Sequence, residues 1–300
     1  MIKVRVPATS ANMGSGFDSL GVALTLYNYV SIERISGPDE IKIMGEGEDF
    51  LPCDETNLIY KCVKKVFEKS GRESVGIRLV MENHIPVTRG LGSSSASIVG
   101  GFFAANALLG EPFSKEELLS MAVEIEGHGD NATPAIFGGF CVNVPTKNRI
   151  NYISTPVKED LKFATFIPDF FLQTKKSRAA LPEKVLHKDA VFNVGRSALL
   201  TASIMSGKYE NIRVAMGDRL HQDYRKRFIP GMGEIFDLCY NNKALGVYLS
   251  GAGPTIIGII DGDDDSFNTK VESVLNKKMN NWQLEVLSAD NEGAVVLGGL

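Results

Sequence analysis

One segment, Pro86-Val87-Thr88-Arg89-Gly90-Leu91-Gly92-Ser93-Ser94-Ser95-Ala96-Ser97, joins a predicted strand to a long uncharged run of residues. Glycine at positions 90 and 92 permits positive φ angles and lets other groups approach the backbone closely. Three hydroxyls follow where a helix is predicted to begin, and the N–H groups and dipole of a helix start bind anions. The segment therefore predicts a site for the di- or triphosphate of a nucleotide. The hydroxyl of Ser93 or Ser94 is also able to bind Mg²⁺ there.

Other interpretations of this segment have different consequences. One interpretation that stays open is that the segment is a flexible turn that only caps a buried helix, since short motifs of this kind match by chance. A P-loop fails because no lysine follows the glycines, and the dinucleotide fingerprint needs glycine or alanine where Ser95 stands. A nucleophile elbow stays open as the rival class, because residues 92 to 96 nearly match G-x-S-x-G. In such a serine hydrolase Ser94 is the nucleophile, with Asp169 and either His187 or His221 as partners.

The composition is that of an ordinary globular protein. The 300 residues (32.6 kDa) are 44% apolar and 23% charged, so the chain can bury a substantial core. At roughly 150 residues per domain, the length predicts two domains. A net charge of −4 gives no general attraction to nucleic acid or anionic lipid. Any polyanionic partner is therefore expected to be small and held locally.

Four cysteines are scattered along the chain without a C-x-x-C pair: Cys53, Cys62, Cys141 and Cys239. This predicts buried thiols in a reducing cytosol rather than disulfides or a zinc knuckle. The N-terminus alternates apolar and basic residues instead of forming the apolar run of a signal peptide, so no export is expected. The uncharged run from Gly90 to Gly110 is long enough to cross a bilayer, but its first third is polar and loop-like. We therefore expect no membrane span.

Hydrophobic periodicity predicts short strands alternating with helices. The first 45 residues show the alternation of antiparallel strands with one solvated face. A helix is expected at 56–70, capped by Thr56 or Asn57 and stopped by Gly71, and another at 114–126, with a capping box at Ser114 and Glu117. Further strands are expected at 76–82, 139–144, 161–168, 247–249, 255–260, 284–287 and 294–297, and further helices at 98–109, 193–206 and 267–276.

The order of these elements predicts an α+β fold rather than a doubly wound sheet, because regular βαβ spacing is missing. A polar and irregular stretch at 145–156 is the expected boundary between two domains. We place the domains at 1–152 and 153–300, with the last strand able to return to the first domain.

Two further glycine-rich motifs accompany residues 86–97. They are Pro7-Ala8-Thr9-Ser10-Ala11-Asn12-Met13-Gly14-Ser15-Gly16-Phe17-Asp18-Ser19-Leu20-Gly21 and Ser250-Gly251-Ala252-Gly253-Pro254-Thr255. In this order and spacing, the three resemble the motifs of the GHMP small-molecule kinases over essentially the whole chain. The resemblance implies an N-terminal, S5-like α/β domain that binds ATP and contains a left-handed βαβ unit. It also implies a ferredoxin-like C-terminal domain, with the site between the two.

Among GHMP kinases the chain most resembles the homoserine kinases. That resemblance implies transfer of the γ-phosphoryl group of ATP, with Mg²⁺, to the side-chain hydroxyl of L-homoserine, a step towards threonine. Another GHMP kinase, acting on mevalonate, shikimate or a sugar, is the near alternative. A cytoplasmic homodimer is implied by analogy alone. The expected ATP contacts are Asn57, Pro86, Val87, Thr88, Arg89, Gly90, Leu91, Gly92, Ser93, Ser94, Ser95 and Ala96.

An amino-acid acceptor presents an ammonium group and a carboxylate on one carbon. Its pocket should offer a carboxylate or amides to the ammonium group and a guanidinium to the carboxylate. Positions that match the family supply both kinds of group. The expected substrate-binding residues are Asn12, Asp18, His128, Thr174, Arg178, Arg225 and Gly251.

The segment Glu126-Gly127-His128-Gly129-Asp130-Asn131 also resembles the family, although glycine stands at 129 where proline is common. Glu126 and Ser94 are the expected oxygen ligands of Mg²⁺. The resemblance implies that the catalytic residues are His128, Asp130 and Asn131, with Asn131 near the transferred phosphoryl group. Asp130 corresponds to an aspartate that acts as a base in some relatives. Because phosphoryl transfer depends mainly on positioning and charge neutralisation, we hypothesise that no strong general base is needed.

Overall fold

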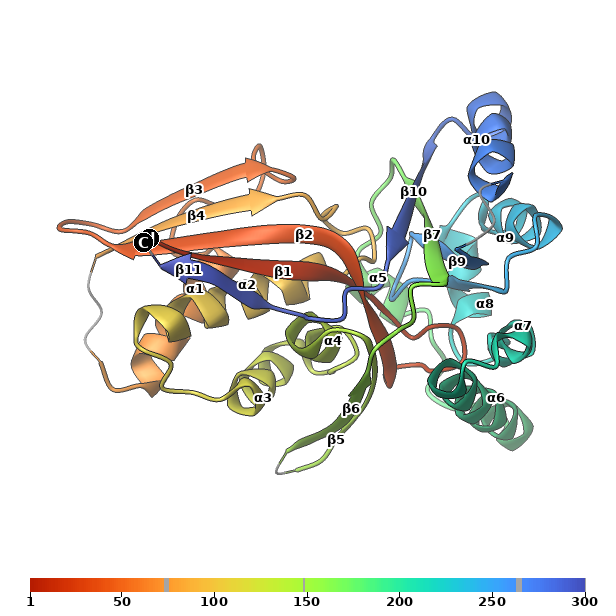
Figure 1. Cartoon of the computed structure of the whole chain (residues 1–300), viewed down its shortest axis with the longest axis horizontal. Coiled ribbons are helices and arrows are strands. Elements are labelled where there is room, and N and C mark those ends of the chain that lie inside the picture. Colours follow the sequence, from red (N-terminus) through yellow and green to blue (C-terminus); the bar gives the residue numbers. More distant parts are fainter. Residues whose placement is uncertain (73–75, 148, 263–265, 300) are drawn as a thin grey trace.

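The computed structural model describes residues 1–72, 76–147, 149–262 and 266–299. Two sheets form its frame, one at each end of the molecule (Figure 1). The first sheet runs in the order β11-β1-β2-β4-β3, and β5 and β6 branch from β2. Its strands are β1 (Ile2–Ala11), β2 (Leu20–Arg34), β3 (Glu40–Gly45), β4 (Ile77–Asn83), β5 (Phe140–Pro145), β6 (Ile150–Thr155) and β11 (Val295–Gly299).

The second sheet has the order β10-β7-β9-β8, so its strands lie as fourth, first, third and second in chain order. They are β7 (Leu161–Pro168), β8 (Gly246–Leu249), β9 (Ile256–Asp261) and β10 (Trp282–Ser288). Every described strand pair in this sheet is antiparallel. In the first sheet, β3 and β4 are parallel because helix α1 (Leu58–Lys69) crosses between them. The predicted α+β class is confirmed.

The last strand joins the first sheet. After β10, the chain crosses to the opposite end of the molecule, and β11 pairs with β1, where Ile2 faces Gly299 (Figure 1). The two ends of the described chain therefore lie side by side. The chain therefore passes between the two sheets twice, once from β6 to β7 and once from β10 to β11.

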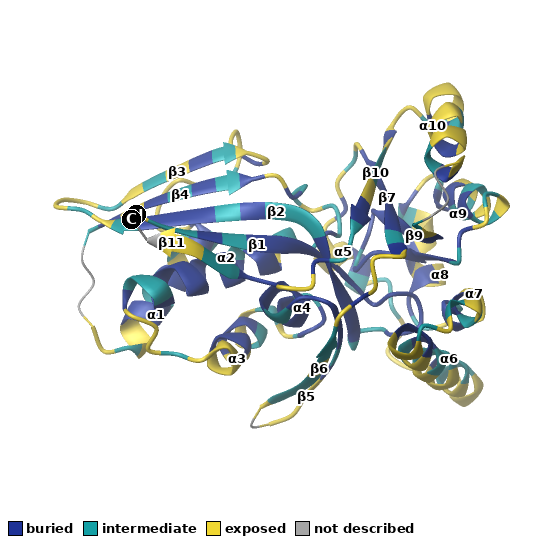
Figure 2. Ribbon diagram, in the orientation of Figure 1, coloured by how far each residue is buried: buried dark blue, intermediate teal, exposed yellow. Residues whose placement is uncertain are grey.

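Four helices cover one face of the first sheet: α1, α2 (Ser93–Leu108), α3 (Lys115–Glu126) and α4 (Ala132–Phe137) (Figure 1). The others accompany the second sheet: α5 (Thr174–Arg178), α6 (His187–Ser206), α7 (Ile212–Ala215), α8 (Gln222–Arg225), α9 (Met232–Asn241) and α10 (Ser266–Lys278). Two short 3₁₀ helices are η1 (Tyr209–Asn211) and η2 (Lys226–Phe228). Figure 2 shows buried residues concentrated in β1, β2 and α2, whereas α6 and α10 expose much of their surface.

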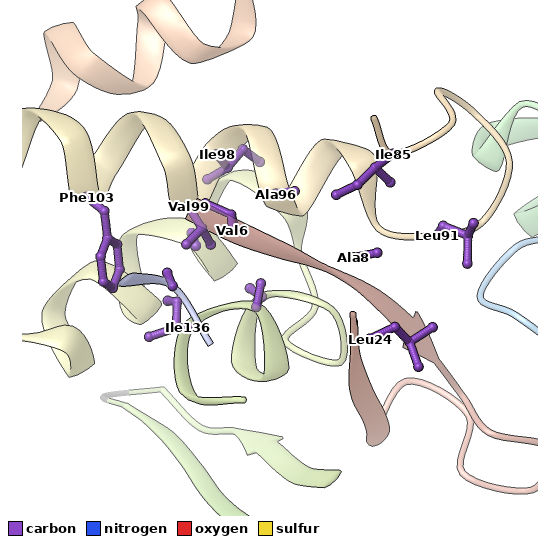
Figure 3. Packing of buried hydrophobic residues seen from close by; sticks show 14 of the residues in the cluster. Val6, Ala8, Leu24, Ile85, Leu91, Ala96, Ile98, Val99, Phe103 and Ile136 are labelled. Carbon is purple, nitrogen blue, oxygen red and sulfur yellow. The ribbon is translucent and has the colours of Figure 1, made fainter. Parts of the chain in front are cut away.

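Helix α2 is the uncharged run, and it is a core helix. Its side chain Val99 lies beside Val6 of β1 (Figure 3), and Ala96 and Ile98 belong to the same buried cluster. Small residues allow α1 to approach it from another side, since a Cβ on Gly101 would stand 2.9 Å from the carbonyl oxygen of Ile59. None of the helices in the described residues combines the length and hydropathy that a membrane span requires.

The helix caps agree with the sequence, and several boundaries do not. Asn57 caps α1, and Ser114 with Glu117 forms the capping box of α3. Helix α2 begins at Ser93, at the hydroxyls where the loop motif predicts a helix start, whereas apolar periodicity alone places its start at 98 because the first turn is polar. Helix α6 begins at His187 instead of 193. The stretch 145–156, where the border between the two domains is expected, contains strand β6. Short helices such as α5 and α8 were not predicted, since four or five residues show no period.

Candidate active site

A cavity of about 560 Å³ lies where all three glycine-rich motifs meet. The predicted site residues that line it are Asn12, Asp18, Asn57, Val87, Thr88, Arg89, Gly90, Gly92, Ser93, Ser94, Ser95, Glu126, His128, Asp130, Asn131, Thr174, Arg178, Arg225 and Gly251. Pro86, Leu91 and Ala96 are not among the lining residues. The side chains of Leu91 and Ala96 are 0% and 1% exposed and belong to the core, so these two cannot contact a nucleotide through their side chains.

The backbone at residues 88–92 has the conformation that its glycines permit. Gly90 and Gly92 have φ angles of +85° and +69°. A Cβ at Gly90 would stand 2.6 Å from the carbonyl oxygen of Ser250, and one at Gly92 would stand 2.0 Å from Oγ1 of Thr9. Both glycines are therefore needed for packing against the other two motifs, in addition to their positive φ.

Hydrogen bonds connect the three motifs directly. The Ser250 hydroxyl donates to the carbonyl of Gly90 at 2.6 Å and shares a 2.7 Å hydrogen bond with the Ser10 hydroxyl. The N–H of Gly251 donates to the Ala11 carbonyl at 3.1 Å. Residues more than 150 positions apart thus form one rigid wall of the cavity.

The start of α2 is open to the cavity. Gly92 is its N-cap and supplies no side-chain hydrogen bond, while Ser93, Ser94 and Ser95 form the first turn and line the cavity. The first N–H groups of a helix have no partner within the helix, and the dipole adds positive potential at this end. An anionic group in the cavity would satisfy these donors.

The Arg89 side chain is directed towards the second sheet. Its guanidinium lies 3.8 Å from the centroid of the Phe171 ring and donates from Nε to the Pro168 carbonyl at 2.9 Å and from Nη2 to the Asp169 carbonyl at 3.2 Å. Burial lowers its pKa. Arg89 therefore links the loop to the segment after β7, and its head group is already engaged there.

The Glu126 carboxylate lies at the end of α3, opposite the first turn of α2. The Ser95 hydroxyl is 2.7 Å and 2.6 Å from its two oxygens, and the Ser94 hydroxyl also interacts with it. Burial raises the pKa of Glu126 in spite of these contacts. A half-buried carboxylate beside two hydroxyls is the oxygen-rich donor set that a hard divalent cation prefers. Sequence reasoning had named Ser94, and the structure adds Ser95.

His128 and Asp130 form a pair. Nδ1 of His128 is 2.6 Å from Oδ1 of Asp130, whose side chain is 2% exposed. Burial would lower the pKa of His128, but the hydrogen bond and the charges of Asp130 and Glu126 outweigh it and raise this pKa. The carboxylate of Asp130 is thus occupied by an imidazole in this structure.

Asn131 is held by Thr9, a residue that was not among the predicted site residues. The hydroxyl of Thr9 donates to Oδ1 of Asn131 at 2.9 Å. Because Oδ1 is engaged, the amide nitrogen of Asn131 is the group available to donate into the cavity. Thr9 lies in the N-terminal motif, and its side chain is 0% exposed.

Replacing Thr9 by valine is expected to lower kcat about 5-fold, because the loss of a hydrogen bond worth about 1 kcal/mol frees the amide of Asn131 to rotate. Steady-state kinetics of the phosphoryl transfer that the motifs predict measure the effect. Serine at position 9 keeps the hydroxyl and should retain kcat within about 3-fold. Equal kcat values for the valine and serine variants would contradict the role given to this contact.

Asp18 and Arg178 pair with each other at the cavity edge. The guanidinium donates to the two carboxylate oxygens at 2.8 Å and 3.1 Å, a bidentate contact between half-exposed side chains. Asn12 accepts from the N–H of Asp18 and donates to the carbonyl of Gly251 at 2.9 Å. Sequence reasoning had assigned Asp18 and Arg178 to opposite charges of one substrate, and their mutual pairing is an addition from the structure.

Arg225 is the most deeply placed cation of the cavity. It is 1% exposed, and its Nη1 donates to the Gly251 carbonyl at 2.8 Å and to Nδ1 of His221 at 3.2 Å. Burial, followed by the neighbouring charge of Arg178, lowers its pKa to about 10. Nε has no hydrogen-bond partner. A buried guanidinium held by neutral partners favours the approach of an anion.

The Asp218 carboxylate organises the turn that carries Arg225. It accepts the N–H groups of Leu220, His221 and Gln222 at 2.9, 2.9 and 2.7 Å, and the amide of Asn193 at 2.8 Å. Burial alone would raise the pKa of Asp218, but the neighbouring His221 and these donors lower it below its ordinary value.

Because the pKa of Asp218 is lower in the folded state than in the unfolded state, its stabilisation is present above the unfolded pKa of about 3.9 and is lost as the pH falls through the folded pKa. Asp218→Asn should therefore lower the free energy of unfolding by about 2 kcal/mol at pH 7 and by less below pH 4. Urea unfolding at both pH values measures this difference. Asp223→Asn, at an exposed position of α8, is the matched control. A difference that grows towards low pH would contradict the account.

The residues of the serine hydrolase alternative do not come together. His221 has its two ring nitrogens engaged by the Gly14 carbonyl and Arg225. His187 is exposed at the start of α6. Asp169 follows β7, where its backbone pairs with Asn281. Neither histidine nor Asp169 lines the cavity beside Ser94, so the structure contradicts this triad.

Other cavity residues were missed because the motifs do not contain them. Leu51 and Pro52 lie in the loop before α1, and Met81 and Asn83 alternate on β4. The period of two on β4 was a usable signal, since it directs alternate side chains to one face. Together with Asn57, these residues line a more apolar part of the cavity.

The thiols do not contribute to the cavity. All four cysteines are described and free, and Cys53 is exposed, so the prediction of four buried thiols was wrong at this position. Burial raises the pKa of Cys62 and Cys141 to about 12, and that of Cys239 also rises. These three are therefore unreactive at neutral pH.

Comparisons with known proteins agree with the geometry. Residues 57–139 match the family described as GHMP kinases N terminal domain, and residues 199–280 match GHMP kinases C terminal. A homoserine kinase of Clostridium botulinum (strain Alaska E43 / Type E3) is 47% identical over 300 residues, covering 100% of this chain and 99% of the relative. A homoserine kinase of Caldicellulosiruptor saccharolyticus is 47% identical over 298 residues, covering 99% and 96%.

Solved structures resemble the whole chain. The crystal structure of homoserine kinase from Cytophaga hutchinsonii has a TM-score of 0.87 at 29% identity and covers 99% of this chain and 97% of that one. The mevalonate kinase of L. major has a TM-score of 0.73 at 14% identity and covers 96% of both chains, a likeness of fold alone.

Proposed function

The chain belongs to the GHMP kinases, and among them to the homoserine kinases, and from this membership we propose how its residues act. It transfers the γ-phosphoryl group of ATP to the side-chain hydroxyl of L-homoserine and forms O-phospho-L-homoserine and ADP. The product is an intermediate of threonine biosynthesis.

One observation carries this proposal. A single cavity is bordered both by the open N-terminus of α2 and by the buried guanidinium of Arg225. The N-terminus of the helix suits a polyphosphate, and the guanidinium suits a carboxylate. An acceptor with a carboxylate can thus be held beside a nucleotide, with its hydroxyl directed at the terminal phosphate.

The nucleotide occupies the part of the cavity between the loop and β4. Its phosphates accept hydrogen bonds from the N–H groups of the first turn of α2. Its base lies against the apolar part lined by Leu51, Pro52 and Met81, next to Asn57. The side chain of Asn57 is engaged in capping α1 and in donating to the Pro52 carbonyl, so its main contribution is to the shape of this wall.

Glu126, Ser94 and Ser95 are the residues that would hold Mg²⁺. They fit, because burial disfavours the charged carboxylate of Glu126, and a cation would relieve this cost. When bound, Mg²⁺ supplies neutralisation of the phosphate charge. Glu126 also fixes the Ser95 hydroxyl, which orients the start of α2.

The acceptor occupies the other part of the cavity. Arg225 binds its carboxylate, since this cation is held only by neutral hydrogen-bond partners. Asp18, fixed by Arg178 and Asn12, accepts from its ammonium group. These two contacts hold the two charged groups on one carbon of the acceptor, and so orient the side-chain hydroxyl that attacks the phosphoryl group. Thr174 and Gly251 complete the border of this part.

The transfer itself relies on charge stabilisation and alignment. Asn131, held by Thr9, donates to the transferred phosphoryl group. Asp130 is paired with His128, which satisfies its charge and holds both side chains at the cavity wall. The hydroxyl proton then passes to the phosphoryl oxygens late in the reaction, as a loose transition state allows.

Asp130→Asn is expected to lower kcat by less than about 10²-fold, with KM for L-homoserine changed by less than about 3-fold, because no strong general base is required. Steady-state kinetics with saturating ATP provide both constants. A loss above about 10⁴-fold with unchanged substrate binding, at the upper end of general-base effects, would show that Asp130 is a base.

An ADP-release assay across L-homoserine, L-serine, mevalonate, galactose and shikimate tests the function. We expect release with L-homoserine and loss of release when Mg²⁺ is chelated. Activity on mevalonate, galactose or shikimate, and not on L-homoserine, would overturn the assignment. The homodimer and the cytoplasmic location stay predictions, which sedimentation velocity and cell fractionation would check.

A further inference from the structure

His221 lies next to the guanidinium that faces the acceptor. It precedes α8 and stands one helical turn before Arg225, which ends that helix. Its side chain is 0% exposed. Its Nε2 is 2.7 Å from the Gly14 carbonyl, and its Nδ1 is 3.2 Å from Nη1 of Arg225. A fully buried imidazole thus connects the N-terminal motif to the guanidinium.

The Gly14 carbonyl and the Arg225 guanidinium determine the protonation state of the His221 ring. A carbonyl oxygen can only accept, so Nε2 carries the proton that is donated to Gly14. A guanidinium can only donate, so Nδ1 is unprotonated and accepts from Arg225. The imidazole is therefore neutral, and burial agrees with this by lowering the pKa of His221. A protonated ring would leave Nη1 of Arg225 without this acceptor.

The ring is held in its plane from several sides. It stacks on Phe17 with centroids 5.2 Å apart and planes 26° apart. Asp218 accepts the backbone N–H of His221 at 2.9 Å and has Oδ2 3.7 Å from Nε2. These contacts fix where Nδ1 points, and hence where Nη1 of Arg225 lies.

Arg225 has few other constraints. Nη1 is shared between His221 and the Gly251 carbonyl, and Nε has no partner. The Phe17 ring is a further neighbour, with its centroid 5.4 Å from the centre of the guanidinium. The contact with Nδ1 is therefore well placed to set the direction of the remaining donors.

We propose that His221 is a positioning residue for the acceptor carboxylate: the unprotonated Nδ1 orients Arg225 so that its fork of N–H groups meets the carboxylate of the amino acid. This inference rests on the proposed function. It concerns specificity for an acceptor that carries a carboxylate, and His221 itself touches neither substrate nor nucleotide.

Two amide variants separate the polar contacts of the ring. In His221→Asn, the short amide reaches about as far as Nδ1, and its oxygen can accept from Arg225 while the contact to Gly14 is lost. In His221→Gln, the longer amide reaches about as far as Nε2 and can donate to Gly14 while the acceptor for Arg225 is lost. Both remove the aromatic stack on Phe17, so they form a matched pair.

The proposal predicts a split between the kinetic constants. His221→Gln should raise KM for L-homoserine about 10-fold, with kcat and KM for ATP changed less than 2-fold, whereas His221→Asn should raise KM for L-homoserine less than 3-fold. In a background of Arg225→Met, either substitution should change KM for L-homoserine by less than 2-fold. A loss of structure alone would instead lower kcat and both affinities together.

A ligand without the carboxylate gives a second readout. Calorimetry should show that His221→Gln weakens binding of L-homoserine about 10-fold and leaves binding of 3-amino-1-propanol unchanged. Equal weakening of both ligands, or equal effects of the asparagine and glutamine variants, would overturn the inference while leaving the kinase assignment intact. A wild-type protein that neither binds nor phosphorylates L-homoserine would overturn both.

Discussion

Glu126→Gln is expected to lower kcat/KM about 10²- to 10³-fold, the cost typical of removing one group that stabilises transition-state charge. The substitution keeps the shape of the side chain and removes the negative charge opposite Ser94 and Ser95. The concentration of Mg²⁺ that gives half-maximal rate should rise at least about 10-fold, since a neutral amide oxygen is a poor ligand for a hard cation. Initial rates at saturating ATP and acceptor, measured across Mg²⁺ concentrations, give both quantities.

Glu124→Gln is the matched control. Glu124 lies on the same helix, but its side chain is 60% exposed and pairs with Lys65 on the surface. This variant should keep the rate and the Mg²⁺ dependence of the wild type within about 2-fold. If Glu126→Gln behaved like Glu124→Gln, the cation site would have to lie elsewhere in the cavity.

Arg225→Met has the next largest expected effect. It should raise KM for L-homoserine about 10- to 100-fold, because a charge-assisted contact is worth about 1.5–3 kcal/mol. KM for ATP should change less than 2-fold, since the phosphates lie at the start of α2. The free energy of unfolding should change little, because relief of the cost of burying this cation offsets the loss of its hydrogen bonds to Gly251 and His221. Steady-state kinetics and urea unfolding test the two statements.

Arg227→Met is the control for this substitution, since Arg227 is exposed two residues further along the chain. It should leave KM for L-homoserine unchanged. An equal rise of KM for ATP and for L-homoserine in Arg225→Met would contradict a specific role in binding the acceptor. It would indicate a general deformation of the cavity instead.

Local sequence signals predicted the parts of the fold that depend on interactions between residues close together in the sequence. The caps of α1 and α3 follow from Asn57 and Ser114, because their side chains bond to N–H groups two or three residues away. Apolar runs and alternation predicted most strands of the two sheets, but not β6, which lies in the polar stretch 145–156. Apolar periodicity alone placed the start of α2 at 98, five residues late, because its serines show no apolar period.

The residues of the site also divide into those that local sequence signals predict and those that they do not. The motifs identified most residues that line the cavity, because each motif is continuous in sequence. The pairings between motifs were not predicted: Thr9 with Asn131 spans 122 positions, and Asp18 with Arg178 spans 160. Spacing along the chain contains no information about such contacts. Sequence alone makes His221 a candidate only for the hydrolase triad, although it stands one helical turn before Arg225.

The central claim is that the start of α2 holds the polyphosphate of ATP. A crystal structure of the protein with Mg²⁺ and adenylyl imidodiphosphate tests it most directly. We expect the β- and γ-phosphates to accept hydrogen bonds from the backbone N–H groups of residues 92–95, with the cation beside Glu126. Phosphates found elsewhere in the cavity, or at another surface with these N–H groups bound only to water, would contradict the claim.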